Sequence, residues 1–248
     1  MDNQKLKKFL PVGILLIAVL VVVGIVIAVR GGGDNTPVDE DEQVADVAFQ
    51  QRPAVVLVPR ADGHWLDLTI MGMDKVQGAS TMEYLFLYTT ANGAEQGSSG
   101  GPYDLSSEDM VEEELLLGTT SSGNFYYDEG VEAGELTLRY RNDDGKLVGK
   151  VTVPWVRREG AEMVEIEGWS FTPEEAEDIY VLAMHGFGLP SDVTGTLASG
   201  PVGFFSSDED TQGTVTAPSG IVYAWNESEW TMVEVDSAVT SGIFVSTN

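Results

Sequence analysis

The chain of 248 residues carries 13 Lys and Arg against 40 Asp and Glu, which gives a formal net charge of -27 at pH 7. We do not expect so acidic a chain to bind nucleic acid, because that requires a cationic surface to displace counterions from the phosphates. The absence of cysteine excludes disulfides and a lipidated cysteine. With only two histidines, a tetrahedral zinc site is not expected either, and the sequence indicates no cofactor and no metal.

An apolar segment near the start of the chain, Phe9–Val29, contains no charged side chain and one proline. As a helix its 21 residues would span roughly 32 Å, which matches the hydrocarbon core of a bilayer. We therefore predict a single transmembrane helix in contact with the lipid bilayer. Representative anchor positions along it are Phe9, Leu16, Val22 and Val29.

The charges that flank this segment predict its orientation. Residues 1–8 include Lys5, Lys7 and Lys8, whereas an acidic stretch follows the apolar segment. Since cationic flanks stay on the cytoplasmic side, the N-terminus is predicted to be cytoplasmic and the rest of the chain to lie outside the cell membrane. A cleaved signal peptide is the alternative, but the apolar regions of signal peptides run about 7 to 15 residues, so the length favours an uncleaved anchor.

Residues 30–47 contain three glycines, one proline and an acidic run, and are predicted to form a flexible linker. Without the four cations and one carboxylate found up to Arg30, 9 Lys and Arg face 39 Asp and Glu, a formal charge of -30 outside the membrane. The outer part has no disulfide to stabilise it. It must therefore be held together by burial of an apolar core.

Residues 48–155 show short apolar runs separated by Gly, Asp, Asn and Ser, which is typical of β-strands. Seven such runs predict an all-β domain of the immunoglobulin-like or fibronectin-III-like sandwich class. In the third run, aromatic residues alternate with leucines, so we expect that strand to lie inside a sheet. The predicted strands are Ala54–Val58, Trp65–Met71, Met82–Thr89, Val111–Leu117, Asn124–Tyr127, Glu135–Arg141 and Leu147–Val153.

The last two of these strands form a predicted hairpin, whose four-residue loop sets Arg141 opposite Lys146. Alternation turns six apolar side chains inward: Leu136, Leu138, Tyr140, Leu147, Val151 and Val153. It places four cations on one outer face: Arg139, Arg141, Lys146 and Lys150. With Arg157 and Arg158, six of the nine outer cations fall in this region. They either neutralise nearby carboxylates or form a patch for an anionic envelope polymer or an envelope protein.

The run Leu115–Val153 contains LLGTTSSGNFYYDEGV followed by ELTLRYRNDDGKLVGKVTV. It resembles a segment of uncharacterised exported, single-pass, membrane-anchored β-sandwich proteins of small-genome environmental bacteria. The resemblance implies a location and a fold, and no activity. It also implies that some relatives carry two cysteines where this chain has Thr120 and Phe125, so a loop stapled there is unstapled here.

A second β-rich domain is predicted over residues 161–248, with Pro154–Gly160 as the boundary. Thr172 and Pro173 are predicted to start a brief helix, and Trp225 is predicted to pair with Trp230 across a hairpin. The strands expected here are Met163–Glu167, Ile179–His185, Val193–Leu197, Val202–Phe205, Gly213–Thr216, Ile221–Trp225, Trp230–Val235 and Ile243–Ser246.

No catalytic signature in the sequence withstands inspection. Gly97–Pro102 resembles the nucleophile loop of trypsin-like proteases, but its distance from His64 is far too short, and a flexible Gly/Ser loop is expected. We therefore favour a non-enzymatic module for surface binding, adhesion or envelope assembly. The alternative is an envelope hydrolase that acts on glycan or peptide through a carboxylate pair.

Overall fold

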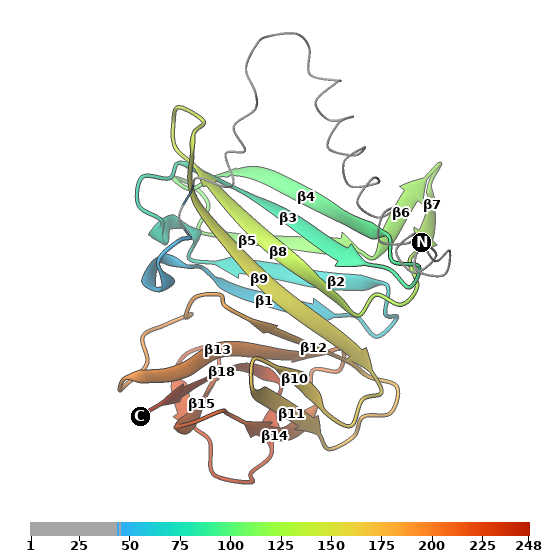
Figure 1. Ribbon diagram of the computed structural model, residues 1–248, viewed down its shortest axis with the longest axis vertical. Helices are drawn as coiled ribbons and strands as arrows, with labels where there is room; N and C mark the ends of the chain where they lie inside the picture. Colours follow the sequence, from blue (N-terminus) through green and yellow to red (C-terminus); the bar gives the residue numbers. More distant parts are fainter. Residues whose placement is uncertain (1–43, 45) are drawn as a thin grey trace, which may run out of the picture. The chain divides into compact units, whose positions relative to one another are not determined.

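The computed structural model describes residue 44 and residues 46–248, which belong to a compact unit spanning Asp41–Asn248 (Figure 1). The predicted transmembrane segment Phe9–Val29, the lysines at positions 5, 7 and 8, and most of the linker lie outside the described residues. Among the residues that are described, no helix has the length and apolar character needed to cross a membrane.

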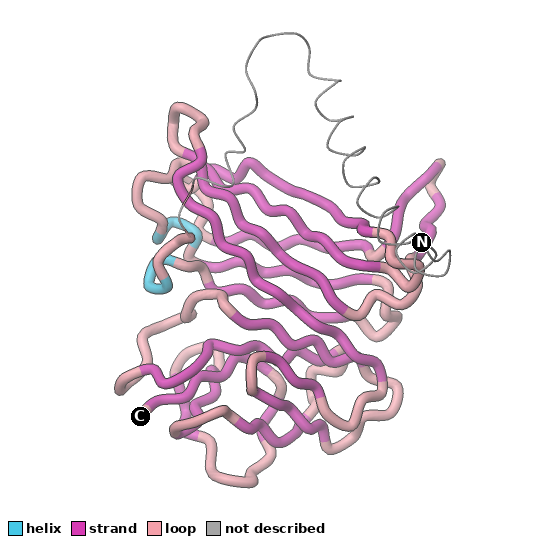
Figure 2. The backbone as a smooth tube through the Cα atoms, in the orientation of Figure 1, coloured by secondary structure: helices cyan, strands magenta, loops and turns pink. Residues whose placement is uncertain are grey.

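The described part is all-β, with strands throughout, as Figure 2 shows. The strands form several antiparallel sheets. Two short 3-10 helices, η1 (Phe49–Gln51) and η2 (Met73–Lys75), accompany the strands. The strands of the N-terminal half are β1 (Ala54–Pro59), β2 (Trp65–Met71), β3 (Thr81–Thr89), β4 (Glu95–Asp104), β5 (Met110–Leu116), β6 (Gly118–Ser121), β7 (Asn124–Tyr127), β8 (Ala133–Arg141) and β9 (Leu147–Glu159). Those of the C-terminal half are β10 (Val164–Ile166), β11 (Trp169–Pro173), β12 (Tyr180–His185), β13 (Leu197–Ser206), β14 (Gln212–Thr216), β15 (Ile221–Trp225), β16 (Trp230–Met232), β17 (Val239–Thr240) and β18 (Gly242–Thr247).

One nine-stranded sheet joins the two halves of the chain, in the order β16-β15-β18-β13-β12-β9-β8-β3-β4. A three-stranded sheet, β1-β2-β5, and a four-stranded sheet, β10-β11-β14-β17, pack against it, and β6 and β7 form a separate hairpin. The two packed sheets cover opposite faces. On β12, Leu182 and Met184 belong to one apolar cluster, whereas Val181 and Ala183, which alternate with them, belong to the other.

The larger cluster draws on both halves of the sequence. Around the inward residues of β1, β2, β3, β5, β8 and β9 it gathers five residues from the C-terminal half: Leu182, Met184, Phe187, Phe205 and Ile243. The smaller cluster is centred on Trp169, Phe171, Phe204 and Phe244, all fully buried. Neither half of the chain therefore completes the larger core by itself.

Strand β9 runs through the segment predicted as the boundary between two domains. It pairs with β8 from Leu147 to Val156 and with β12 from Trp155 to Glu159, so Pro154–Gly160 is a paired strand followed by a single turn residue, and not a linker. The division into residues 48–155 and 161–248 stays a prediction. The shared sheet leads us to expect that the two parts unfold together.

Most predicted strands form within one or two residues of their expected ends, and the predicted pair Trp225 and Trp230 lies directly opposite, with ring centroids 5.3 Å apart. Four expectations are wrong. The predicted strand Val193–Leu197 does not form, and only Leu197 is in a strand, as the first residue of β13. The Gly/Ser segment Gly97–Pro102 is part of β4, an edge strand in which Gly100 lies against the Tyr84 ring and Gly97 lies close to the backbone of β3. Thr172 and Pro173 end β11 and start no helix. A bulge after Tyr140 sets Arg141 opposite Leu147 rather than Lys146.

A buried guanidinium ties the loops at one end of the sheet together. Arg157 donates from Nε to the carbonyl of Val131 (3.1 Å) and from a terminal nitrogen to the carbonyl of Gly63 (2.7 Å), and it lies 4.8 Å from the centroid of the Tyr180 ring. Burial lowers the pKa of Arg157 below its ordinary value. The sequence placed this residue among the outer cations, but its side chain is interior and structural.

If one sheet unites the structure, the two apolar clusters should lose their order in a single transition. Trp155 and Trp169 report on the larger and the smaller cluster respectively. In the chain labelled with fluorotryptophan, we expect the fluorine signals of these two residues to disappear at the same denaturant concentration. Assignment uses Trp→Phe variants. Two separate midpoints, or a protease cut between Pro154 and Met163 that releases two folded fragments, would instead support two independent domains.

Candidate functional site

The hairpin formed by β6 and β7 projects from the body of the structure (Figure 1). Its two-residue turn is Ser122–Gly123, and both residues have positive φ (52° and 78°), which is the signature of a type I′ turn. Thr120 and Phe125 face each other across the hairpin. Its base is fixed by the fully buried Leu117, which donates its N–H to the carbonyl of His64 at 2.8 Å.

The second strand of the hairpin exposes three consecutive aromatic side chains to solvent. Phe125, Tyr126 and Tyr127 are 51%, 58% and 44% exposed. Alternation along the strand turns Phe125 and Tyr127 to one face and Tyr126 to the other. Large apolar side chains that gather on the surface about half in water are a mark of interaction sites rather than of cores.

Two rings from the start of β2 support the face that carries Phe125 and Tyr127. The His64 ring stacks on Tyr127 with centroids 3.9 Å apart and an angle of 6° between the planes. Trp65 meets Phe125 edge to face at 5.4 Å, and Phe125 and Tyr127 lie parallel at 6.3 Å. We call these four residues, His64, Trp65, Phe125 and Tyr127, the aromatic cluster. Such contacts hold a hairpin that two strands alone would leave marginal in water.

A charged network adjoins the aromatic cluster. Arg60 lies 5.7 Å from the centroid of Trp65, donates to both oxygens of Asp67 from Nε at 3.0 Å, and also pairs with Glu114. The hydrogen bond to Asp67, followed by that to Glu114, raises the pKa of Arg60. Its charge is therefore already matched by the protein's own carboxylates.

An open groove of about 560 Å³ runs over the outer face of β2 and β5 beside this network. Its lining consists of Trp65, Asp67, Leu68, Thr69, Glu112, Glu113 and Glu114, and we call it the carboxylate groove. Trp65 belongs both to the groove and to the aromatic cluster. The two features therefore form one surface, with exposed rings at one end and hydrogen-bond acceptors along its length.

A wider open cleft of about 950 Å³ lies near the groove, on the C-terminal side of β1. Arg60 and Asp67 line it together with carboxylates from three loops of the C-terminal half: Glu177, Asp178, Asp208, Glu209 and Glu227. Within residues 46–248, no group of three or more His, Asp and Glu side chains has the arrangement that would hold a metal ion.

The structure brings three of the four predicted patch cations onto neighbouring strands. Arg139 lies opposite Lys150 on β9 and opposite Glu83 on β3. Arg141 forms an ion pair with Glu83 (3.0 Å) and donates to the carbonyl of Gly145 (3.0 Å). Arg139, Arg141 and Lys150 all have partners within the protein, and only Lys146 is exposed. This arrangement favours the interpretation in which these cations neutralise nearby carboxylates.

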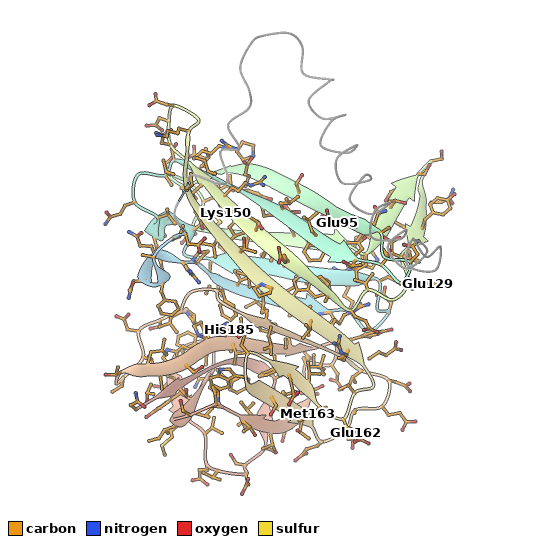
Figure 3. All side chains as sticks on the ribbon, in the orientation of Figure 1. Glu95, Glu129, Lys150, Glu162, Met163 and His185 are labelled. Atoms are coloured by element: carbon orange, nitrogen blue, oxygen red, sulfur yellow. The ribbon has the colours of Figure 1, made fainter. Side chains whose placement is uncertain are left out.

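The cationic patch and the aromatic hairpin are separate surfaces. Figure 3 labels Lys150 on β9 and Glu129, which follows β7, and the two lie far apart in the view. The sequence predicted the strand Asn124–Tyr127 correctly but gave it no role. The signal that could have identified it is the run of three aromatics directly after a Gly-containing turn, because a strand packed on one face needs only alternate apolar residues.

A scan against protein-family models finds no match, and searches of curated proteins and of solved structures find no significant similarity. Function must therefore be inferred from the residues themselves.

Charge reversal tests whether the cationic patch balances charge or recognises a partner. The Arg141→Glu substitution removes the ion pair with Glu83 and places two carboxylates side by side. We therefore expect the free energy of unfolding to fall by about 1 kcal/mol. The control is Lys146→Glu on the exposed loop, expected to change stability by no more than about 0.5 kcal/mol. Denaturant unfolding measures both. Unchanged stability in Arg141→Glu, with salt-sensitive binding to an anionic polymer lost, would instead favour recognition by the patch.

Proposed function

We propose that the protein is a single-pass, membrane-anchored, extracytoplasmic β-sandwich protein that acts as a non-enzymatic module for surface binding, adhesion or envelope assembly. The observation that carries this proposal is the projecting hairpin with three consecutive half-exposed aromatic side chains, Phe125, Tyr126 and Tyr127. Recognition is assigned to this hairpin and to the carboxylate groove beside it.

The finer assignment of the fold supports a recognition role. Strand order β1-β2-β5 facing β9-β8-β3-β4 fits a seven-stranded sandwich of the immunoglobulin or fibronectin-III kind, and the second half adds its own sheet and apolar cluster. The aromatic hairpin is inserted between β5 and β8, where it extends the connection between the two sheets. Connections at the ends of sandwiches are common sites of binding because a rigid scaffold positions them. Fold similarity by itself assigns no activity.

An envelope hydrolase that acts on glycan or peptide is the alternative. The open cleft beside Arg60, with its several carboxylates, is one place that could hold a catalytic carboxylate pair. We place it second because those carboxylates stand on exposed loops. A general acid that works near neutral pH is usually desolvated in an apolar pocket.

Removing the aromatic rings tests the proposal. In the full chain reconstituted in nanodiscs, replacing Phe125, Tyr126 and Tyr127 together by serine should reduce co-sedimentation with isolated cell envelopes at least tenfold, since the apolar area that the hairpin buries at the interface is lost. The control is Met232→Ser combined with Val235→Ser, which removes exposed apolar side chains of β16 and the segment after it. An equal loss in the control, or no loss in the hairpin variant, would remove the hairpin as the recognition surface.

The proposed topology can be tested by cysteine labelling, because the chain has no cysteine and an introduced one is the only thiol that can react. A single cysteine in place of Val235, which is 91% exposed, should react with a membrane-impermeant maleimide added to intact cells. A cysteine in place of Asn3 should react only after the cells are opened. The reverse pattern would mean that the described β structure lies in the cytoplasm.

A further inference from the structure

We infer that the surface formed by the aromatic cluster and the carboxylate groove binds an uncharged polysaccharide. This inference deepens the proposed function and rests on it. It concerns the chemistry of the ligand, which follows from three features of the surface: exposed rings, a row of acceptors and the sign of the surrounding charge.

The rings provide an apolar platform. Phe125 and Tyr127 lie parallel 6.3 Å apart and are about half exposed, and His64 covers one face of Tyr127. Trp65, which meets Phe125 edge to face, also lines the groove. A pyranose ring presents a face of polarised C–H groups, which are attracted to the negative face of an aromatic ring. Covering these rings with sugar removes apolar area from water without placing an unsatisfied polar group against them.

The groove supplies acceptors for hydroxyl groups. Asp67, Thr69, Glu112 and Glu114 line it, and their carboxylate and hydroxyl oxygens can accept hydrogen bonds from a ligand rich in O–H donors. Hydrogen bonds to a carboxylate are stronger than those between neutral groups. The volume of about 560 Å³ lies within the range of roughly 300–1,000 Å³ found for small-ligand sites.

The charge of the surface argues against anionic ligands. An anionic polymer would meet several carboxylates in the groove and a strongly acidic protein around them. Single-stranded nucleic acid also stacks on aromatic rings, but it needs a cationic groove to follow its backbone. A cationic partner would compete for Asp67 and Glu114 with Arg60, which already lies over Trp65 and pairs with both carboxylates.

The test uses the full chain in nanodiscs and two uncharged hexasaccharides, one of β-linked glucose and one of β-linked N-acetylglucosamine. Titration calorimetry should detect binding of at least one of them. Raising the salt from 50 mM to 500 mM should change the affinity by less than about twofold, because screening acts on charged ligands. A polylysine peptide and a polyglutamate peptide serve as charged competitors.

The strand itself offers a matched set of variants. Phe125→Ala and Tyr127→Ala each remove a ring on the supported face, and each should weaken binding about tenfold or more, the range found for ring stacking on a ligand. Tyr126→Ala removes an equally exposed ring on the opposite face of the same strand and should stay within about twofold of the unmodified chain. The fluorine signals of Trp155 and Trp169 verify that each variant is folded, and a shift at Trp65 locates the ligand.

The outcomes separate the ligand class from the broader proposal. Failure of both sugars to bind, or an equal loss in Tyr126→Ala, overturns this inference. If the chain still co-sediments with cell envelopes through the hairpin, the proposed function stands although the ligand is not such a sugar. Salt-sensitive binding of polylysine alone would assign the surface to a cationic partner and also overturn the inference. Sugar that binds and is shortened with time would support the ligand class while overturning the non-enzymatic role.

Discussion

Burial of both faces of the nine-stranded sheet at β12, where the two halves of the chain meet, is the constraint on which the rest of the structure depends. Strand β12 places Leu182 and Met184 in one apolar cluster and Val181 and Ala183 in the other, so it cannot form a stable strand until both covering sheets are present. Strands buried on both faces are near-continuous apolar runs, and β12 has this character. Because β9 pairs with both β8 and β12, the same ladder of hydrogen bonds transmits order from one half of the chain to the other.

Hydrogen bonds from a few polar side chains hold loops and strands onto the apolar core. The Arg157 guanidinium satisfies two loop carbonyls from within the protein, and Arg52 does the same for Val47 (3.0 Å) and Gly186 (2.6 Å), which holds the start of the described chain against the turn after β12. At the far edge, the Tyr103 hydroxyl donates to Glu113 and joins β4 to β5 across the two sheets. Burial, then this hydrogen bond, raises the pKa of Tyr103. Few acidic groups are needed for these roles, which leaves most of the carboxylates in solvent.

The aromatic hairpin differs from the rest of the structure, because its large apolar side chains are not buried. A two-stranded hairpin outside the main sheets gains little stability by itself. This one nevertheless has three aromatic side chains at positions that are about half exposed. His64 and Trp65 stabilise one face of it, and no buried core requires Tyr126. Residues that break the local rules of burial without a structural gain mark functional surfaces. The electrostatic setting then limits the ligand, since the neighbouring charges are acidic and the nearby Arg60 is already paired.

The sequence by itself determined the all-β class, most strand positions and the inward residues of the β8–β9 hairpin, because alternation and turn residues are local signals. It mistook Gly97–Pro102 for a loop, since glycine carries no strand signal and only pairing with β3 makes an edge strand there. Tertiary structure alone decided that Arg157 is buried, that Arg141 pairs with Glu83, and that Trp65 meets Phe125 beside the carboxylate groove. These contacts join residues distant in sequence, and their geometry depends on how the sheets pack, which no local pattern encodes.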